Sequence, residues 1–325
     1  MTARYTIHQL HVFAAVAERA SFSRAAADLH LTQPTVSMQV KQLAEVLGVV
    51  LFEGQLRGGG AGRSRVRLTA AGHEVLEAAR EVARAGQALE ERLAALAGVR
   101  RGRVRVCAAS TAEYFVPRLL GAFQQAHPGV EVELQVQNRQ VVTQRLADDA
   151  DDLYIMTQPP TDHPVVVEAF ADNPLVVVAP ARHPLVAARK VALAELAAQD
   201  WVLREEGAGT RLVADSFLAQ RGIRLSTRLQ LGSNEAVKQA VIGGFGLAIL
   251  SLHALRDEIL HHRRVRIVAV EGFPIPGRWH WVSRTGRRAS PAASALQRFA
   301  AAQVPTLAAE LAHLQDVARR RQFAG

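Results

Sequence analysis

Three helix starts crowded into the first fifty residues constrain the fold of this chain more than any other feature. Thr6 is followed three residues later by a glutamine, and this pair is a capping box that begins a helix. Ser23 can cap a second, short helix. Thr32 can cap a third, in which Pro34 occupies the first turn, where a missing N–H costs nothing. Gly48 then ends this helix, and the arrangement predicts a helix-turn-helix.

The predicted third helix has two distinct faces. Its apolar residues recur at helical spacing and form a buried stripe of Val36, Val40, Leu43 and Leu47. The opposite face is polar, fits the major groove of B-DNA, and carries amides and hydroxyls that can reach base edges. The residues predicted to contact DNA here are Ser23, Thr32, Gln33, Pro34, Thr35, Ser37, Met38, Gln39 and Lys41. The alternative is a small helical bundle whose polar face is merely solvated.

The stretch after this helix reads VVLFEGQLRGGGAGRSRVRLT, two strand-like segments around a glycine-rich loop. A strand pair beside a helix-turn-helix is a wing, and arginines crowd here against a single acid, Glu53. Such arginines can follow the phosphates or reach into the minor groove. Arg63 and Arg65 are the predicted wing contacts. The alternative is an ordinary surface hairpin.

A long helix is predicted from a cap at Thr69 to about Ala97. Its apolar residues alternate at steps of four and three for three heptads, which is typical of a coiled-coil seam. The seam positions are Val75, Ala79, Val82, Gly86, Leu89, Leu93 and Leu96. Such a seam needs a partner, most simply the same helix of a second chain, so a dimer would present two recognition helices to an interrupted palindrome. The alternative is one amphipathic helix packed on its own domain.

Composition bounds the partner and the compartment. The 325 residues carry a formal net charge of +9 and a sequence pI near 10.8, which favours an anionic partner such as nucleic acid or a charged metabolite. A single cysteine, Cys107, excludes an internal disulfide framework and fits a reducing compartment. The sequence has no export signal and no apolar stretch of about 18 residues, so we expect a cytoplasmic protein with no membrane partner.

Beyond a basic hinge, strand-like and helix-like segments alternate, which predicts an α/β architecture with mostly parallel sheets. In such sheets ligands sit beyond the carboxyl ends of strands, where the next helix begins. Helix N-termini suit phosphate or carboxylate groups, and three such junctions carry polar residues. These residues are Ser110, Thr111, Glu205, Thr210, Arg211, Ser233, Asn234, Glu235 and Lys238. They predict a shared anion site, and the alternative is that each is only a cap or turn residue.

The segment from Phe22 to Glu53, followed by RLTAAG and the long helix, resembles the N-terminal region of the LysR-type transcriptional regulators. The resemblance continues in VVVAPARHPL, EEGAGTR and GGFGLAILS. It implies an α/β protein overall, with an all-α winged helix-turn-helix, a long dimerisation helix and two α/β subdomains like those of a periplasmic binding protein. It also implies a homotetramer built as a dimer of dimers, a target in double-stranded DNA, and RNA polymerase as a partner. One departure is Gly54, which stands where the family usually has arginine after LFE, in a wing that is longer than usual.

These features divide the chain into five expected parts. They are a winged helix-turn-helix at 1–69, a linker helix at 70–97, a hinge at 98–103, an effector-binding domain at 104–302 and a tail at 303–325. Within the effector-binding domain we expect subdomain I at about 104–171 and 277–302, and subdomain II at about 172–276.

Several segments resemble one subgroup of this family, the CbbR regulators of Calvin-cycle (RuBisCO) operons. The most specific are SNEAVKQAV and DDLYIM. The resemblance implies an activator of carbon-fixation genes and an anionic effector such as ribulose bisphosphate, phosphoenolpyruvate or NADPH. By position it adds Asn138 and Thr157 to the residues expected to line the effector cleft. The alternative is a LysR-type regulator of another metabolic operon with a different small anionic effector.

An α/β enzyme with a DNA-binding head is a more distant alternative. The sequence contains no P-loop and no nucleophile elbow, and the GGFG segment at Gly243 follows a helix rather than a strand, unlike a dinucleotide fingerprint. No cysteine and histidine spacing suggests zinc. Cys107 is expected to be a small buried residue, and His261 and His262 to be solvated. We therefore predict a regulator without catalytic residues or a metal.

Overall fold

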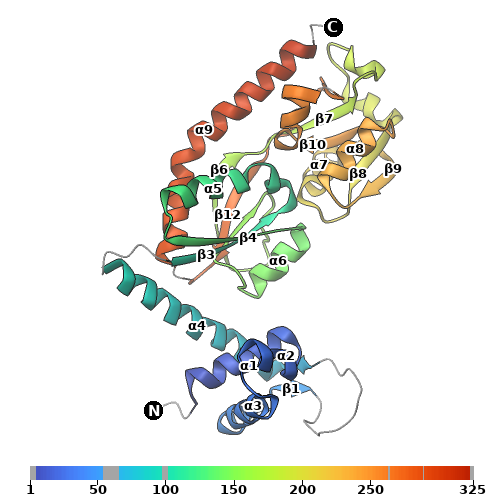
Figure 1. Cartoon of the computed structure of the whole chain (residues 1–325). Coiled ribbons are helices and arrows are strands. Elements are labelled where there is room, and N and C mark those ends of the chain that lie inside the picture. Colours follow the sequence, from blue (N-terminus) through green and yellow to red (C-terminus); the bar gives the residue numbers. More distant parts are fainter. Residues whose placement is uncertain (1–4, 54–65, 97–101, 263, 288, 323–325) are drawn as a thin grey trace. The chain divides into compact units, whose positions relative to one another are not determined.

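The computed structural model describes residues 5–53, 66–96, 102–262, 264–287 and 289–322 (Figure 1). The chain forms two compact units, residues 1–97 and 98–325, called here the N-terminal and the C-terminal unit. No helix in these described ranges is long and apolar enough to cross a membrane. The N-terminal unit contains α1 (Ile7–Arg19), α2 (Phe22–Asp28), α3 (Gln33–Leu47), β1 (Phe52–Glu53), β2 (Arg67–Leu68) and α4 (Ala70–Leu96).

The first three helices begin and end largely where their capping residues predict. Thr6 caps α1 through the predicted capping box, and Thr32 caps α3. Gly48 ends α3 in the left-handed conformation, with a φ of 69° that suits glycine. The predicted cap of α2 is wrong: Ser21, not Ser23, accepts the hydrogen bond from the first turn of that helix.

The reason for the earlier start of α2 lies in the core of the unit. Phe22, its first residue, packs edge-on against Phe52 of β1, with ring centroids 5.6 Å apart. Phe13 of α1 approaches the same ring at 5.4 Å and is fully buried. Val36, Val40 and Leu43, which belong to the predicted stripe of α3, complete this core. Aromatic packing therefore fixes where α2 begins.

The base of the predicted wing is present. Strands β1 and β2 pair antiparallel, with Phe52 opposite Leu68 and Glu53 opposite Arg67. The Arg67 guanidinium lies 3.6 Å from the Glu53 carboxylate. Residues 54–65, which include the predicted contacts Arg63 and Arg65, lie outside the described residues.

The long helix α4 begins at the predicted cap, where the Thr69 hydroxyl accepts a hydrogen bond from the Gly72 N–H at 2.9 Å. Its predicted seam divides into two parts. Ala79 is buried against the unit's own core, in which α1 contacts α4. Leu89 and Leu93 are 51% and 56% exposed. The second half of α4 therefore presents large apolar side chains that the N-terminal unit itself does not cover.

The C-terminal unit has two lobes, each built on its own sheet. The first lobe carries a five-stranded sheet in the order β4-β3-β5-β12-β6. Helices α5 and α9 cover one face of this sheet, where Trp279 and Trp281 are buried, and α6 covers the other, where Cys107 and Tyr154 are buried (Figure 1). The elements of this lobe are β3 (Gly102–Ala109), η1 (Ser110–Tyr114), α5 (Val116–Ala126), β4 (Val130–Gln137), α6 (Arg139–Ala147), β5 (Leu153–Met156), β6 (Val165–Asp172), β12 (Arg278–Arg284) and the start of α9 (Pro291–Gln322). Cys107 is buried, as predicted.

The second lobe carries a three-stranded sheet in the order β10-β7-β11 and a strand pair, β8 with β9. Successive residues of β7 point to opposite faces: Val177 packs in the core beside α7, and Val176 and Val178 pack in the core beside α8. The elements of this lobe are β7 (Leu175–Pro180), η2 (Pro184–Val186), η3 (Leu193–Ala198), β8 (Asp200–Arg204), α7 (Gly209–Ala219), β9 (Ser226–Leu231), α8 (Asn234–Ile242), β10 (Ala248–Ser251), η4 (Leu252–Leu255), the π-helical turn η5 (Glu258–His262) and β11 (Val265–Val268).

The α/β fold class is confirmed, but the expectation of mostly parallel sheets is wrong. Strand β12 runs antiparallel to β5 and β6, and β7 runs antiparallel to β10 and β11. Parallel neighbours need a crossover connection, which is usually a helix. No helix stands between β6 and β7 or between β11 and β12, where the chain passes from one lobe to the other. The chain crosses between the lobes twice in opposite directions, with Leu175 bridged antiparallel to Ile275. At this crossing, a Cβ on Gly277 would lie 2.6 Å from the Asn173 carbonyl oxygen, so the close pairing requires glycine.

Helix α9 belongs to both lobes. Its first turns, with Leu296 and Ala300, pack in the core of the first lobe, and Leu311 and Leu314 pack in the second. Between them, the Glu310 carboxylate accepts hydrogen bonds from Arg118 at 3.0 Å and from Arg256 at 2.8 Å. The helix runs without interruption past residue 303, where the tail was expected to begin, to Gln322 (Figure 1).

Candidate effector site and DNA-contacting face

The polar face of α3 is open to solvent. Gln33, Pro34 and Lys41 are exposed, and Met38 is 50% exposed. The remaining predicted contacts on this helix, Thr35, Ser37 and Gln39, are half-buried. A regular helix with this face fits a major groove, because its outward side chains can meet base edges while the opposite stripe holds the helix in place.

Short hydrogen bonds between neighbours orient the start of this face. The Ser23 hydroxyl donates to the Gln33 side-chain oxygen at 3.4 Å, so α2 holds the amide of the first residue of α3. The Thr32 and Thr35 hydroxyls lie 2.8 Å apart. Lys41 lies 3.6 Å from Glu45 one turn later, in an exposed pair that contributes little to stability and leaves the ammonium available.

In the C-terminal unit, the two lobes meet around one buried arginine that the sequence analysis did not single out. Arg204, the last residue of β8, has a side chain only 2% exposed. Its Nε and Nη2 donate to the two carboxylate oxygens of Glu205 at 2.7 and 2.8 Å. Its Nη1 donates to the Asn234 side-chain oxygen at 2.7 Å, and Nη2 reaches the Ser110 hydroxyl at 3.2 Å.

Two hydroxyls and an amide extend this contact across the lobes. The Asn234 amide nitrogen donates to the Thr111 hydroxyl at 2.9 Å, and Thr111 lies 3.4 Å from the Thr210 hydroxyl. Thr111 belongs to the first lobe, whereas Asn234 and Thr210 belong to the second. We call this set the Arg204 cluster; its members are Ser110, Thr111, Arg204, Glu205, Thr210 and Asn234. It joins the guanidinium of Arg204 with donors from both lobes, which is the chemistry that binds a phosphate or carboxylate, and in this structure the Glu205 carboxylate is the anion that the guanidinium holds.

Burial and the neighbouring charges act in opposite directions on the pKa of Glu205. Burial raises the pKa of Glu205, but the hydrogen bonds and positive charge of Arg204 outweigh it and hold that pKa below its ordinary value. Burial is the main cause of the raised pKa of the Tyr114 phenol; the carboxylates of Glu113 and Glu235 raise it further, and the positive charge of Arg204 opposes them. The Tyr114 hydroxyl is buried with no hydrogen-bond partner among the described residues.

Five of the predicted effector residues lie in the Arg204 cluster, and most of the others have partners close in sequence. Arg211 donates to Asp215 at 2.6 Å and to the Arg204 backbone carbonyl at 3.1 Å, and it lines a different cavity beside Asp215. Lys238 pairs with Glu235 at 2.7 Å. The side chains of Ser233 and Asn138 cap α8 and α6.

Thr157 of the first lobe faces the loop that follows the cluster. A Cβ on Gly209 would lie 2.8 Å from the Thr157 hydroxyl, so the two lobes approach closely here and a larger residue would require Thr157 to turn aside. Arg204 itself carried one sequence signal. It ends an apolar strand, WVLR, and is followed directly by two acids and a glycine turn.

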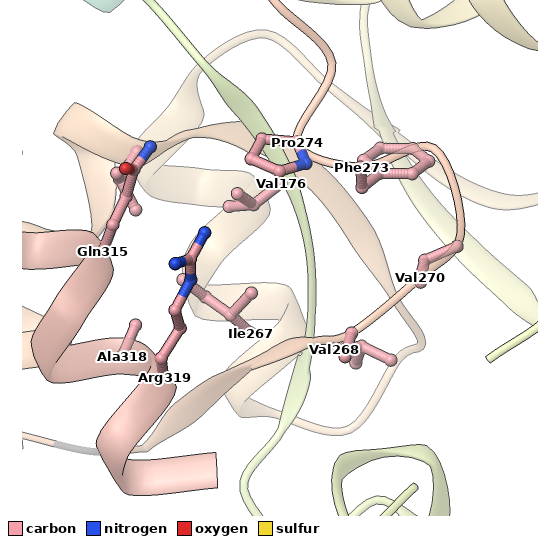
Figure 2. A pocket seen from close by; sticks show the side chains of 11 residues that line it. Val176, Ile267, Val268, Val270, Phe273, Pro274, Gln315, Ala318 and Arg319 are labelled. Carbon is pink, nitrogen blue, oxygen red and sulfur yellow. The ribbon is translucent and has the colours of Figure 1, made fainter. Parts of the chain in front are cut away.

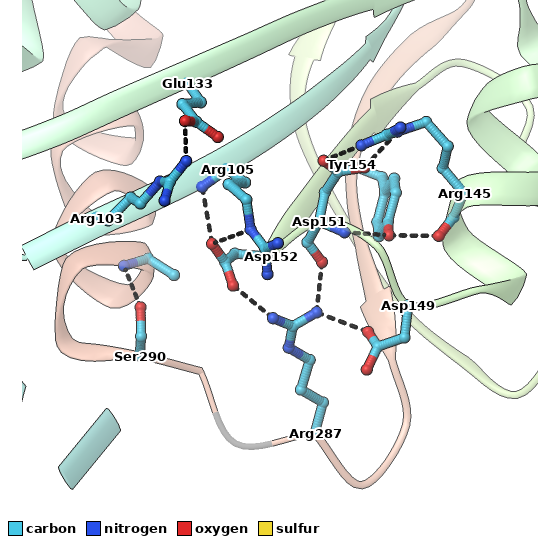
Figure 3. Close-up of polar contacts among 11 residues, drawn as sticks. Arg103, Arg105, Glu133, Arg145, Asp149, Asp151, Asp152, Tyr154, Arg287 and Ser290 are labelled. Carbon is cyan, nitrogen blue, oxygen red and sulfur yellow. Dashed lines mark hydrogen bonds and ion pairs between the residues drawn. The ribbon is translucent and has the colours of Figure 1, made fainter. Parts of the chain in front are cut away.

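A second polar network closes the acidic segment ADDADDLY in the first lobe (Figure 3). Arg287 bonds Asp149 at 2.6 Å and also pairs with Asp152, and Arg145 forms a bidentate pair with Asp151 at 2.7 and 2.8 Å. Each of these carboxylates meets a guanidinium, so the network fixes the loop before β5 and neutralises its charge. No group of three histidine, cysteine or acidic side chains in the described part of the chain could hold a metal ion.

A cavity of about 150 Å³ lies under the end of α9 (Figure 2). Its wall is mainly apolar, with Val176, Ile267 and Phe273, and Gln315 and Arg319 of α9 point toward it. Arg319 is exposed, in contrast to Arg204. An apolar wall cannot replace the water around a phosphate, so this cavity is less suited to an anion than the Arg204 cluster is.

Comparison with known proteins gives two family matches. Residues 7–73 match the model of the bacterial regulatory helix-turn-helix protein of the lysR family, and residues 97–305 match the LysR substrate binding domain. The chain is 45% identical over 90% of its length to a RuBisCO operon transcriptional regulator of Acidithiobacillus ferrooxidans, covering 93% of that protein.

Two solved structures are similar in fold. The regulatory domain of Synechocystis PCC6803 CcmR in complex with 2-PG is 37% identical, with a TM-score of 0.61 over 63% of this chain and 98% of that one. Full-length CbnR complexed with its target DNA has a TM-score of 0.61 at 22% identity, over 91% of this chain and 98% of that one. At that identity the second likeness shows the fold alone.

Proposed function

The chain belongs to the LysR family of DNA-binding transcriptional regulators, and we propose that it controls carbon-fixation genes in response to a small phosphorylated anion. It is a regulator and not an enzyme. Its similarity to RuBisCO operon regulators supports the assignment of the genes. The observation that carries the effector is Arg204, because a buried guanidinium held between two lobes by side chains from both is a site that an anion can bridge.

We infer that DNA binding uses α3 in the major groove and that Gln33 and Gln39 read base edges, with Lys41 on a phosphate. The exposed Leu89 and Leu93 of α4 support pairing of two linker helices. Such a dimer would place two recognition helices about 34 Å apart, one turn of DNA, and its target would be an interrupted palindrome. Pairing of two dimers would give the homotetramer, and RNA polymerase is the expected partner of an activator.

The proposed effector is an anionic metabolite of carbon fixation. 2-phosphoglycolate, bound in the similar CcmR domain, joins ribulose bisphosphate, phosphoenolpyruvate and NADPH as a candidate. Each carries phosphate, which matches a buried guanidinium better than a neutral ligand would. Binding would change the equilibrium between two lobe arrangements, with a coupling free energy of about 1–3 kcal/mol being typical.

The experiment is footprinting at fixed salt on DNA upstream of the protein's own gene and of carbon-fixation genes, with and without these four compounds. A protected palindrome whose extent changes with one of them is the expected result. Protection that none of them alters would favour a LysR-type regulator of another operon. Absence of specific protection on both DNA segments would contradict the carbon-fixation assignment.

A further inference from the structure

The carboxylate of Glu205 occupies the face of Arg204 that an anion would need. The two residues are adjacent in sequence, and the pair is bidentate, at 2.7 and 2.8 Å. The two side chains differ in access, since that of Arg204 is 2% exposed and that of Glu205 is 25% exposed. The guanidinium is therefore shielded from solvent, and the carboxylate that pairs with it is the more accessible of the two groups.

We propose that Glu205 is an internal competitor for the effector: its carboxylate fills the anion position on Arg204, and the effector binds by displacing it. This inference rests on the proposed function, because it concerns the effector site of that regulator. It assigns Glu205 a role opposite to that of a ligand-binding residue, and it predicts the sign of the effect of removing its charge.

The hydrogen-bond partners of Arg204 differ in how easily each can move away from the guanidinium. A guanidinium has five N–H donors, and the other side chains that hold it are neutral. Asn234 is fully buried and is fixed in turn by Thr111. Ser110 begins η1 in the first lobe, and its hydroxyl is a neutral partner at 3.2 Å. Glu205 is partly exposed and stands two residues before Gly207, whose φ of 83° marks a tight turn. It is the partner that can rotate into solvent without disturbing either lobe.

Other donors near the cluster are ready for the incoming anion. Helix α7 is 11 residues long, and its N-cap residue, Ala208, makes no side-chain hydrogen bond to the first turn. The free N–H groups of that turn lie in the same segment as Thr210, a member of the cluster.

Because the effector must displace the Glu205 carboxylate, its own negative charge decides how much it gains by binding Arg204. A carboxylate that replaces Glu205 brings one negative charge for the one it removes, and so gains little at Arg204. A phosphate group carries about −1.5 to −2 at neutral pH and three acceptor oxygens. The site therefore favours phosphorylated anions over simple carboxylates, and Glu205 supplies that selectivity.

The test uses the full-length protein and calorimetric titration with 2-phosphoglycolate and with inorganic phosphate. Glu205→Gln keeps the shape of the side chain and removes its charge. Glu206→Gln is the matched control, because it removes the same charge from the adjacent, exposed residue. We expect Glu205→Gln to bind both anions at least about tenfold more tightly than the unaltered protein, as the loss of a charged hydrogen-bond competitor implies. Glu206→Gln should leave both affinities unchanged.

Three results would overturn the inference. They are weaker binding to Glu205→Gln, equal tightening in both variants, and no phosphate binding to Glu205→Gln. Glu205→Asp, whose carboxylate is one methylene shorter, should fall between the unaltered protein and Glu205→Gln, and its fold can be checked by urea unfolding. DNA footprinting is read separately: lack of protected DNA alongside tighter binding to Glu205→Gln would contradict the proposed function and leave this inference standing.

Discussion

The DNA-contacting face and the Arg204 cluster are built in opposite ways. The side chains of the first come mainly from α3, a single helix of 15 residues, and they point into solvent. Those of the second come from distant segments, with one hydrogen bond joining residues 123 positions apart, and they are mostly buried. A surface on one helix can be altered residue by residue without loss of fold. A buried charge cluster cannot, because each member satisfies another, so binding and stability are linked there.

The strongest test of this difference is Arg204→Ala. It leaves the buried Asn234 side-chain oxygen without its donor and removes the contact with Ser110 of the first lobe, so the free energy of unfolding should fall by about 1–3 kcal/mol. Anion binding should be lost as well. Urea unfolding followed by tryptophan fluorescence measures this directly, because the three tryptophans, Trp201, Trp279 and Trp281, all belong to the C-terminal unit.

Arg211→Ala tests the rival assignment made from the sequence. The structure pairs Arg211 with Asp215 on the same helix, so a much smaller loss of stability and an unchanged anion affinity are expected. If Arg211→Ala abolished anion binding and Arg204→Ala did not, the charge that binds the effector would be Arg211.

On the DNA side, Gln33→Ala should cost about 1–3 kcal/mol of discrimination at one base position and leave anion affinity unchanged. The side chain is exposed, so the unfolding free energy should scarcely change. Lys41→Ala is the matched comparison, since loss of a phosphate contact should weaken binding to all sequences and reduce the salt slope by about one. Competition binding with operator variants at two salt concentrations separates the two. Equal weakening on every sequence by Gln33→Ala would make this residue a positioning contact.

The smallest effect concerns pH and the junction of the lobes. His253 stacks on Phe115 of the first lobe, with ring centroids 4.9 Å apart, and its Nε2 lies 3.1 Å from the Asp172 carbonyl oxygen. Burial lowers the pKa of His253, an effect that the positive charge of Arg118 reinforces and that the Asp172 carbonyl and Glu310 oppose. The unfolded histidine therefore binds a proton first as pH falls, and stability present above about pH 6.5 is lost below it.

We expect His253→Gln to reduce the fall in the urea midpoint between pH 7.5 and pH 5.5, again followed by tryptophan fluorescence. His183 and His280 also have pKa values lowered by burial, so part of the fall should persist. An identical pH dependence in the variant and in the unaltered protein would show that His253 becomes protonated without cost to the fold.

The same contrast explains what could be predicted from the sequence. Capping residues and helical periodicity are local, so Thr6, Thr32 and Gly48 marked the helix-turn-helix correctly. The start of α2 was misplaced because the contact between Phe22 and Phe52 outweighs the local cap. Polar residues after strands identified most of the cluster, but not Arg204. An arginine in an apolar strand shows its partners only when segments such as Ser110 and Asn234 are brought together.

The prediction of mostly parallel sheets was wrong for a related reason. The alternation of strands and helices is a local pattern, whereas β12 returns from the second lobe to pair with β5 and β6. The spacing of the α4 seam is also a local pattern, and Leu89 and Leu93 are exposed; the partner helix stays a prediction.

Helix α9 has a mechanical consequence for any movement of the lobes. The helix is held at both ends, because Leu296 packs in the core of the first lobe and Leu314 packs in the core of the second. Glu310 forms an ion pair with one arginine from each lobe. Pro305 lies between these two residues, and a proline within a helix removes one backbone N–H and crowds the preceding turn. The helix is therefore easiest to bend at that point. We expect the lobes to move apart by bending of α9 at Pro305, and we expect the helix to straighten again when the lobes return to their original arrangement.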